Sequence, residues 1–161
     1  MSQALPEGFL RVTQALAECG HAHAPRWLDA AVRTSQEAAE ALGVAVGQIA
    51  KSVIFKRKAD GVAVLVVTSG DRRVDEKRVA AITGALGRAD AEFVKAATGF
   101  SIGGVAPLAH STVPVTLIDR ELFRFGEIWA AAGHPNGVFK LSPQDLVRIT
   151  AAPVVDVVVS A

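Results

Sequence analysis

The stretch that decides the fold is residues 48–70, QIAKSVIFKRKADGVAVLVVTSG. Its two halves, 49–58 and 62–70, are rich in β-branched residues, which favour strands. Ala59-Asp60-Gly61 separates them and supplies a glycine that can adopt a positive φ in a tight turn. This pattern predicts a β-hairpin. The core of its second strand, VAVLVV, is apolar at every position, so we expect it to be buried on both faces and central in a sheet.

Helix and strand signals continue on both sides of this hairpin, because apolar residues recur every three or four positions behind capping residues. The first expected helix buries Phe9, Val12, Leu16 and Cys19 and ends at Gly20, and the second is capped by Thr34 and Glu37 and ends at Gly43. The third is capped by Asp75, buries Val79, Ile82 and Leu86, and is ended by Gly84 and Gly87. A fourth helix is expected over 91–98, and the last is capped by Ser142 with Pro143 in its first turn. Further strands are expected at 114–119, 127–133, 137–141 and 153–159. Strands outnumber the helices between them, which excludes strict βαβ alternation. The sequence therefore predicts an α+β fold with a mixed, curved, barrel-like sheet surrounded by helices.

Length and composition set the limits within which function can be sought. The 161 residues, half of them hydrophobic, fit one domain over 1–161 with a sizeable core. Seventeen basic residues face 16 acidic ones, so no global cationic field would hold a long nucleic acid, and DNA is not an expected partner. The single cysteine excludes an internal disulfide and a Cys-rich zinc site. No apolar run approaches the roughly 20 residues of a membrane span, so we expect a cytoplasmic protein without a membrane partner.

Lys51 is the most conspicuous residue of the hairpin. Its own face of the strand otherwise carries Ile49, Val53 and Phe55, and the opposite face carries small or apolar residues as well. Because burial of an unpaired ammonium is costly, this lysine either reaches solvent along its stem, finds an anion, or lines a ligand cavity. Lys51 is therefore the leading candidate for a functional side chain.

The loop over 99–107, GFSIGGVAP, is the most unusual segment of the chain. Its glycines allow backbone conformations in which N–H groups approach a ligand closely, and such donors can stabilise the negative charge that develops on an acyl oxygen. The alternative is a glycine-rich turn without a ligand, since the loop lacks the lysine of a P-loop and the dinucleotide-binding pattern.

Other residue types give little support for metal or covalent chemistry. His21 and His23 could share one face of a strand, but no third ligand accompanies them. The serines lack a nucleophile-elbow motif, and Cys19 is expected in the core of the first helix. Trp27 and Trp129 could stack on a base, although packing is the commoner use of a tryptophan.

Three stretches taken together resemble the YbaK and prolyl-tRNA synthetase editing-domain family. They are QIAKSVIF at 48–55, the spacing Gly99-xxx-Gly103-xxx-Pro107, and AAGHPNGVFKLSPQDL at 131–146, and the similarity covers roughly residues 25–160. The resemblance implies a mixed barrel-like sheet and hydrolysis of the ester that joins a wrong amino acid to a tRNA, usually the tRNA for proline. By position, Lys51 matches the functional lysine of the family, and Gly99, Gly103 and Pro107 match the loop that positions the ester. Gly104 and His110 are added as neighbours of that loop.

The implied reaction needs no metal and no cofactor, because an aminoacyl ester requires mainly positioning, a water molecule and stabilisation of the oxyanion. Lys51 would hold the terminal adenosine or its phosphate while the amides of Gly103 and Gly104 face the ester carbonyl. Alternatively, a Lys51 whose pKa is lowered by burial would act as a base. The sequence leaves both roles open.

The resemblance also suggests a substrate and partners. The stretches GFSIGGVAPLAH and WAAAGHPNGVF are most similar to members that act on seryl and threonyl esters, in preference to alanyl or cysteinyl ones. Recognition of a hydroxyl needs buried polar groups, for which Ser101, His110 and Thr68 are candidates. The expected partner is the acceptor end of an aminoacyl-tRNA, with a synthetase or an elongation factor as a further partner. The competing hypotheses are a non-catalytic binding module with the same fold and a hydrolase of other activated esters.

Overall fold

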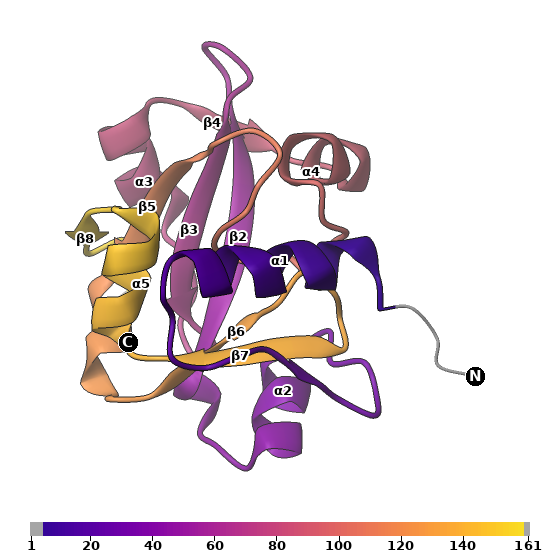
Figure 1. The fold of residues 1–161 in the computed structure, drawn as a ribbon. Coiled ribbons are helices and arrows are strands. Elements are labelled where there is room, and N and C mark those ends of the chain that lie inside the picture. The colour runs from indigo at the N-terminus through magenta and orange to yellow at the C-terminus, as the bar shows by residue number, and fades with distance from the viewer. Residues whose placement is uncertain (1–4, 160–161) are drawn as a thin grey trace.

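The structure, a computed structural model, describes residues 5–159 and contains five α-helices and eight strands in that range (Figure 1). In chain order the elements are α1 (Glu7–Glu18), β1 (Arg26–Trp27), α2 (Ser35–Leu42), the 3₁₀ turn η1 (Val46–Gln48), β2 (Ile49–Arg57), β3 (Ala63–Ser69), α3 (Glu76–Thr83), β4 (Leu86–Arg88), α4 (Ala91–Thr98), β5 (Val115–Asp119), the 3₁₀ turn η2 (Arg120–Arg124), β6 (Ile128–Ala131), β7 (Gly137–Leu141), α5 (Pro143–Thr150) and β8 (Val154–Val155).

The predicted hairpin is the centre of a single mixed sheet. Its strands run in the order β1-β7-β6-β2-β3-β5-β8, and β4 pairs with the far end of β2. β2 is antiparallel to β3 but parallel to β6, and β3 is parallel to β5. β1 and β8 form the two ends of this order, and the sheet does not close on itself. The predicted α+β fold with a mixed sheet is therefore confirmed.

The strand β3 is buried along its whole length, as its apolar sequence predicts, because both faces of the sheet are covered. Leu65 and Val67 belong to the main core, to which α1 and α5 contribute Phe9 and Leu146. The alternate residues Val64 and Val66 belong to a second core with Val79 of α3. Figure 1 shows α1 crossing in front of β2 and β3, with α2 at the end of the sheet where β2 begins.

The predicted helix caps are confirmed. The Thr34 hydroxyl accepts the Glu37 N–H while the Glu37 carboxylate accepts the Thr34 N–H, which is the capping box expected for α2. Asp75 caps α3 and Ser142 caps α5, with Pro143 in the first turn. These local contacts fix where three helices begin, including α2, which borders the site described below.

Three local predictions were wrong. Ile82 is 52% exposed on α3, and Leu86 lies beyond the end of this helix, in β4, so only Val79 of the expected stripe is buried within the helix. Cys19 is exposed, because α1 ends one residue earlier and Cys19 is its C-terminal cap rather than part of its buried face. The strand expected at 153–159 is reduced to β8 and one bridge between Val74 and Val158. Within residues 5–159 no helix is both long and apolar enough to cross a membrane.

Candidate active site

A cavity of about 370 Å³ lies over the first half of β2. It is enclosed by the segment that leads into α2, by the loop after α4, and by β6 and β7, so elements distant in the sequence meet there. Its lining residues are Val32, Arg33, Thr34, Ser35, Ala38, Leu42, Ile49, Ala50, Lys51, Ser52, Val53, Ile54, Ala89, Val94, Ile102, Gly103, Val105, Trp129, Ala130, Ala131, Pro135, Gly137 and Val138. Most of this lining is apolar, and its volume is in the range of small-molecule sites.

Lys51 is one of the lining residues of the cavity, and it is half-buried. Its Nζ donates a hydrogen bond to the carbonyl oxygen of Arg72, 3.1 Å away, in the segment between β3 and α3. Burial lowers the pKa of Lys51, and the nearby Asp71 carboxylate opposes that shift by attraction. The ammonium therefore has one hydrogen-bond acceptor and one nearby anion.

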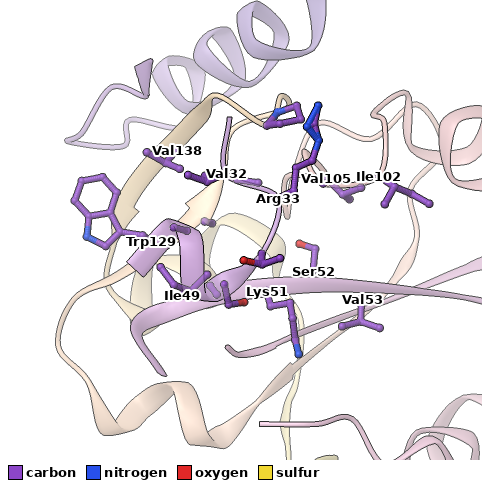
Figure 2. A pocket seen from close by; sticks show the side chains of 18 of the residues that line it. Val32, Arg33, Ile49, Lys51, Ser52, Val53, Ile102, Val105, Trp129 and Val138 are labelled. Atoms are coloured by element: carbon purple, nitrogen blue, oxygen red, sulfur yellow. The ribbon is translucent and has the colours of Figure 1, made fainter. Parts of the chain in front are cut away.

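The ammonium does not point to the side of β2 on which most of the cavity lies. Figure 2 shows Ser52 directing its hydroxyl toward the side occupied by Arg33 and Val105, whereas Lys51 directs Nζ to the opposite side. This follows from the alternation of neighbouring side chains along a strand. The Ser52 hydroxyl thus lies on the side of β2 that carries most of the cavity, and the Lys51 ammonium lies on the other side.

A cluster of charged side chains surrounds the Lys51 end of the site. The Arg124 guanidinium contacts both Asp71 carboxylate oxygens, at 2.8 and 3.2 Å, and donates to the Ser69 hydroxyl. These bonds hold the pKa of Asp71 below its usual range, so the carboxylate stays charged. Arg72 also lies 3.2 Å from Asp71. The negative charge beside Lys51 is therefore held in place by arginines.

The glycine loop contributes less of its backbone to the cavity than expected. Gly103 lines the cavity with φ +95°. Gly104 does not, and its N–H donates to the Ser101 carbonyl oxygen within the loop. A side chain at Gly104 would collide with the backbone of His134, so this glycine permits close packing of two segments. The Ser101 side chain is exposed outside the cavity lining. Of this segment, Gly103 is the residue placed to meet a ligand.

The start of the loop is fastened to α1. Gly99 caps α4, and Arg11 of α1 donates to the carbonyl oxygens of Thr98 and Ala109 at 2.9 and 2.8 Å. The Arg11 guanidinium also lies over the Phe100 ring, 4.4 Å from its centroid. Gly99 therefore has a structural role in the described structure, and Arg11 ties together the two ends of the segment that carries Gly103.

Pro107 and His110 lie elsewhere, at a second cavity of about 360 Å³ between this loop and the end of α5. The His110 Nε2 is 2.6 Å from the Ala106 carbonyl oxygen, and its buried Nδ1 has no hydrogen-bond partner in the described residues. Burial lowers the pKa of His110, which favours the neutral form of the ring. Of the seven residues predicted from the sequence, Lys51 and Gly103 meet at the cavity over β2, whereas Gly99, Ser101, Gly104, Pro107 and His110 do not line it.

Two further candidates from the sequence are separated from the cavity. Thr68 is fully buried opposite Lys51 in β3 and is absent from the cavity lining. His21 and His23 lie near each other, but residues 5–159 contain no group of three or more His, Cys, Asp or Glu side chains that could hold a metal ion. Trp27 is 41% exposed, whereas Trp129 is buried against the cavity.

Two polar residues of the cavity are not predicted by the sequence patterns. Ser52 was counted among small or apolar residues, yet its buried hydroxyl lines the cavity without a hydrogen-bond partner in residues 5–159. Arg33 lines the cavity from the segment before α2, with its side chain directed away from β2 in Figure 2, and within the same range it forms no ion pair. A hydroxyl in an otherwise apolar strand was the signal that could have identified Ser52. No pattern in the sequence singles out Arg33.

Comparisons with known proteins agree with this arrangement. A family model described as the aminoacyl-tRNA editing domain matches residues 29–149, which include β2 and the glycine loop. The chain is 34% identical over 122 residues to the uncharacterized protein YwhH of Bacillus subtilis (strain 168), a match over 75% of this chain and 77% of that protein. It is 33% identical over 95 residues to a proline–tRNA ligase of Thermoanaerobacter sp. (strain X514), a match over 56% of this chain but only 16% of the ligase.

The fold agrees as well. A crystal structure described as "a putative trans-editing enzyme for prolyl tRNA synthetase" superposes with a TM-score of 0.90 at 37% identity, over 98% of this chain and all of the other. The resemblance inferred from the three sequence stretches is thereby confirmed. The chain belongs to the aminoacyl-tRNA editing domain family.

Proposed function

We propose that this protein is a trans-editing aminoacyl-tRNA deacylase. It hydrolyses the ester between a small, wrongly attached amino acid and tRNA, preferring seryl and threonyl groups over alanyl and cysteinyl ones, on the tRNA for proline or on other tRNAs. The observation that supports this proposal most strongly is the cavity over β2, an apolar chamber beside the strand that carries the half-buried Lys51. Family membership supports the editing role.

The charge of the cavity fits an anionic substrate with an uncharged acyl side chain. Its lining within residues 5–159 includes Lys51, whose ammonium lies on the far side of β2, and Arg33, but no carboxylate. An RNA acceptor end brings phosphates, which bind such cations through charge-assisted hydrogen bonds. The apolar lining suits a small side chain. We therefore propose that the aminoacyl-tRNA binds with its phosphate at the rim of the cavity and its acyl group in the apolar chamber.

Lys51 acts in this proposal as a cation and not as a base. Burial lowers the pKa of Lys51, but its Nζ donates to the Arg72 carbonyl and lies near the charged Asp71, and these two contacts oppose the loss of the proton. Held in this way, it binds the phosphate or ribose next to the ester. A water molecule attacks the acyl carbon, the bond from that carbon to the ribose oxygen breaks, and a proton passes to that oxygen. The products are the free amino acid and deacylated tRNA.

Two proposals concern the setting of the reaction. The enzyme works in the cytoplasm and recognises mostly the acceptor end, aided by a synthetase or an elongation factor. It requires no metal and no cofactor, since positioning and an activated ester account for hydrolysis.

The test is hydrolysis of one tRNA charged in turn with Ser, Thr, Ala, Cys and Pro, with chelator present. Lys51→Ala should lower kcat/KM by at least about a hundredfold, the loss expected when a charge-assisted contact on the substrate is removed. Lys51→Arg cannot act as a base at neutral pH, so partial activity in this variant supports the cation role. Lys58→Ala, at an exposed lysine beyond the same strand, is the matched control.

The outcomes separate the hypotheses. If no ester is cleaved faster than its spontaneous rate, the deacylase proposal is wrong, and binding without catalysis is the next hypothesis to pursue. If free aminoacyl esters are cleaved as fast as charged tRNA, the enzyme is a small-molecule esterase instead.

A further inference from the structure

The side of β2 that faces away from β3 is only partly paired. β6 pairs with it at Ile49 and Ala50, and β4 pairs with it at 55–57. Between those two contacts, residues 51–54 have a strand neighbour on the β3 side only. This gap in the sheet opens onto the cavity, which residues 51–54 line.

The direction of the backbone groups in the gap follows from bonds at the two ends of β2. The Ile49 carbonyl oxygen accepts the Gly70 N–H at 2.8 Å, and the Arg57 N–H donates to the Val62 carbonyl oxygen at 2.9 Å. In an antiparallel pair alternate residues bond to the same neighbour, so odd-numbered residues of β2 bond to β3. The N–H and C=O groups of Ser52 therefore point into the gap.

The side chain of Ser52 opens onto the same cavity. Figure 2 shows its hydroxyl directed toward the side on which Val105 and Arg33 lie. The hydroxyl oxygen is buried and has no hydrogen-bond partner within residues 5–159. Leaving a buried polar group unpaired costs about 1–3 kcal/mol, so a ligand that supplies the missing partner gains affinity there.

We propose that Ser52 is the specificity-determining residue of the site and that it hydrogen-bonds the side-chain hydroxyl of a seryl or threonyl group. This inference rests on the proposed deacylase function. The α-ammonium is a poor alternative partner, because within the described residues the cavity lining contains no carboxylate to pair with it. The neutral side-chain hydroxyl of a seryl or threonyl group can donate to the Ser52 Oγ and can also accept from an N–H such as the Ser52 backbone N–H in the gap.

This assignment differs from the one based on the sequence. Ser101, His110 and Thr68 do not line the cavity, so none of them meets a ligand bound there. Apart from Ser52, the hydroxyls of the lining are those of Thr34 and Ser35, at the start of α2, and Thr34 is already engaged as the cap of that helix. The Ser52 hydroxyl is the one that lies on β2, among the apolar residues of the lining.

The experiment compares seryl and alanyl esters on one tRNA, because these substrates differ by a single hydroxyl. Wild type should prefer the seryl ester. Ser52→Ala should lower kcat/KM for the seryl ester by about tenfold, the equivalent of one hydrogen bond of roughly 1.4 kcal/mol, and leave the alanyl ester unchanged. Ser52→Thr keeps the hydroxyl and should retain the preference. Ser35→Ala removes another serine of the lining and should not change the ratio.

The outcomes distinguish this inference from the proposed function. If Ser52→Ala cleaves both esters with the wild-type ratio, or slows both equally, Ser52 does not recognise the acyl hydroxyl and the inference is wrong, while the deacylase function stands. If wild type cleaves neither ester, the proposed function fails and the inference fails with it. Thermal melts of every variant show whether a loss of rate comes from a loss of folded protein.

Discussion

The two faces of β2 differ in chemistry although they belong to the same nine residues. One face directs Ser52 into a chamber lined by valine, isoleucine and alanine, with an unpartnered hydroxyl as its polar spot. The other directs Lys51 toward the Arg72 carbonyl, near an ion-pair cluster of Asp71 and Arg124. Because neighbouring side chains of a strand point to opposite faces, Ser52 presents a neutral group on one face of β2 and Lys51 presents a charge on the other.

This difference explains why one strand can serve a substrate with two unlike ends. An aminoacyl ester joins a small acyl group to a polyanion, and each end needs surroundings that would be unfavourable for the other. If the account is correct, changes on the chamber face should alter which acyl group is accepted. Substitutions on the charged face should alter how the deacylation rate depends on pH, and the preference for one acyl group over another should be retained.

The largest effect on the chamber side is expected from Arg11→Ala. This change removes two hydrogen bonds to loop carbonyls and the contact with Phe100, so it should destabilise the fold by about 2 kcal/mol and lower the melting temperature by about 5 °C. Deacylation should fall about tenfold, because the loop that holds Gly103 loosens. Calorimetry and initial rates measure the two effects.

Arg120→Ala is the control for Arg11. Arg120 is 63% exposed and pairs with Asp156 at the surface, so its loss should change stability by less than about 0.5 kcal/mol. Equal destabilisation by the two variants would contradict the role given to Arg11.

A smaller effect is expected from Gly103→Ala, compared with Gly20→Ala. Both glycines have positive φ, +95° and +73°, and a Cβ would have ordinary contacts at Gly103 and none within 4 Å at Gly20. Each substitution should therefore cost about 1–2 kcal/mol through backbone strain alone. Only Gly103 lines the cavity, so only its variant should also lose deacylation, by about fivefold. A matching loss of rate in Gly20→Ala would show that strain, not position, lowers the activity.

The smallest effect is a change in pH dependence, expected from Asp71→Asn. The Asp71 charge raises the pKa of Lys51 against the lowering caused by burial, so its removal lowers that pKa further. A cation that must be protonated loses function as pH rises through its pKa. Asp71→Asn should therefore lose deacylation at a lower pH than wild type, by a few-fold at a chosen alkaline pH, after subtraction of spontaneous hydrolysis.

Asp60→Asn, in the exposed turn of the hairpin, should leave the pH profile of wild type unchanged. If Asp71→Asn instead gains activity at alkaline pH, a neutral Lys51 is the active form, and the role of this residue as a base is favoured.

The fold was largely predictable because local signals decided it. The hairpin at 48–70, the capping box of Thr34 and Glu37 and the Ser142-Pro143 start of α5 depend on neighbouring residues only, and all are confirmed. The sequence-based predictions were wrong where contacts between distant segments determine the local structure. The Asp119 carboxylate accepts the Val157 N–H, and Asp156 pairs with Arg78 and Arg120, so the segment after β8 serves side-chain contacts rather than a long strand.

The site was predictable only in part for the same reason. Lys51 stood out as a charge in an apolar strand, and Gly103 belonged to an unusual loop. Ser52 and Arg33 could not be assigned, since their meaning depends on the gap between β6 and β4 and on the segment folded over it. His110 was placed with the site by its nearness to Pro107 in sequence, yet the loop turns both residues toward the second cavity.

The most direct test of the account is to locate a non-hydrolysable seryl-amide analogue of the tRNA terminal adenosine on the protein by crystallography. We expect the seryl hydroxyl within hydrogen-bond distance of Ser52 in the cavity over β2, with the nucleoside toward Lys51. An analogue bound at the second cavity beside His110, or bound with its acyl group outside the β2 gap, would contradict it.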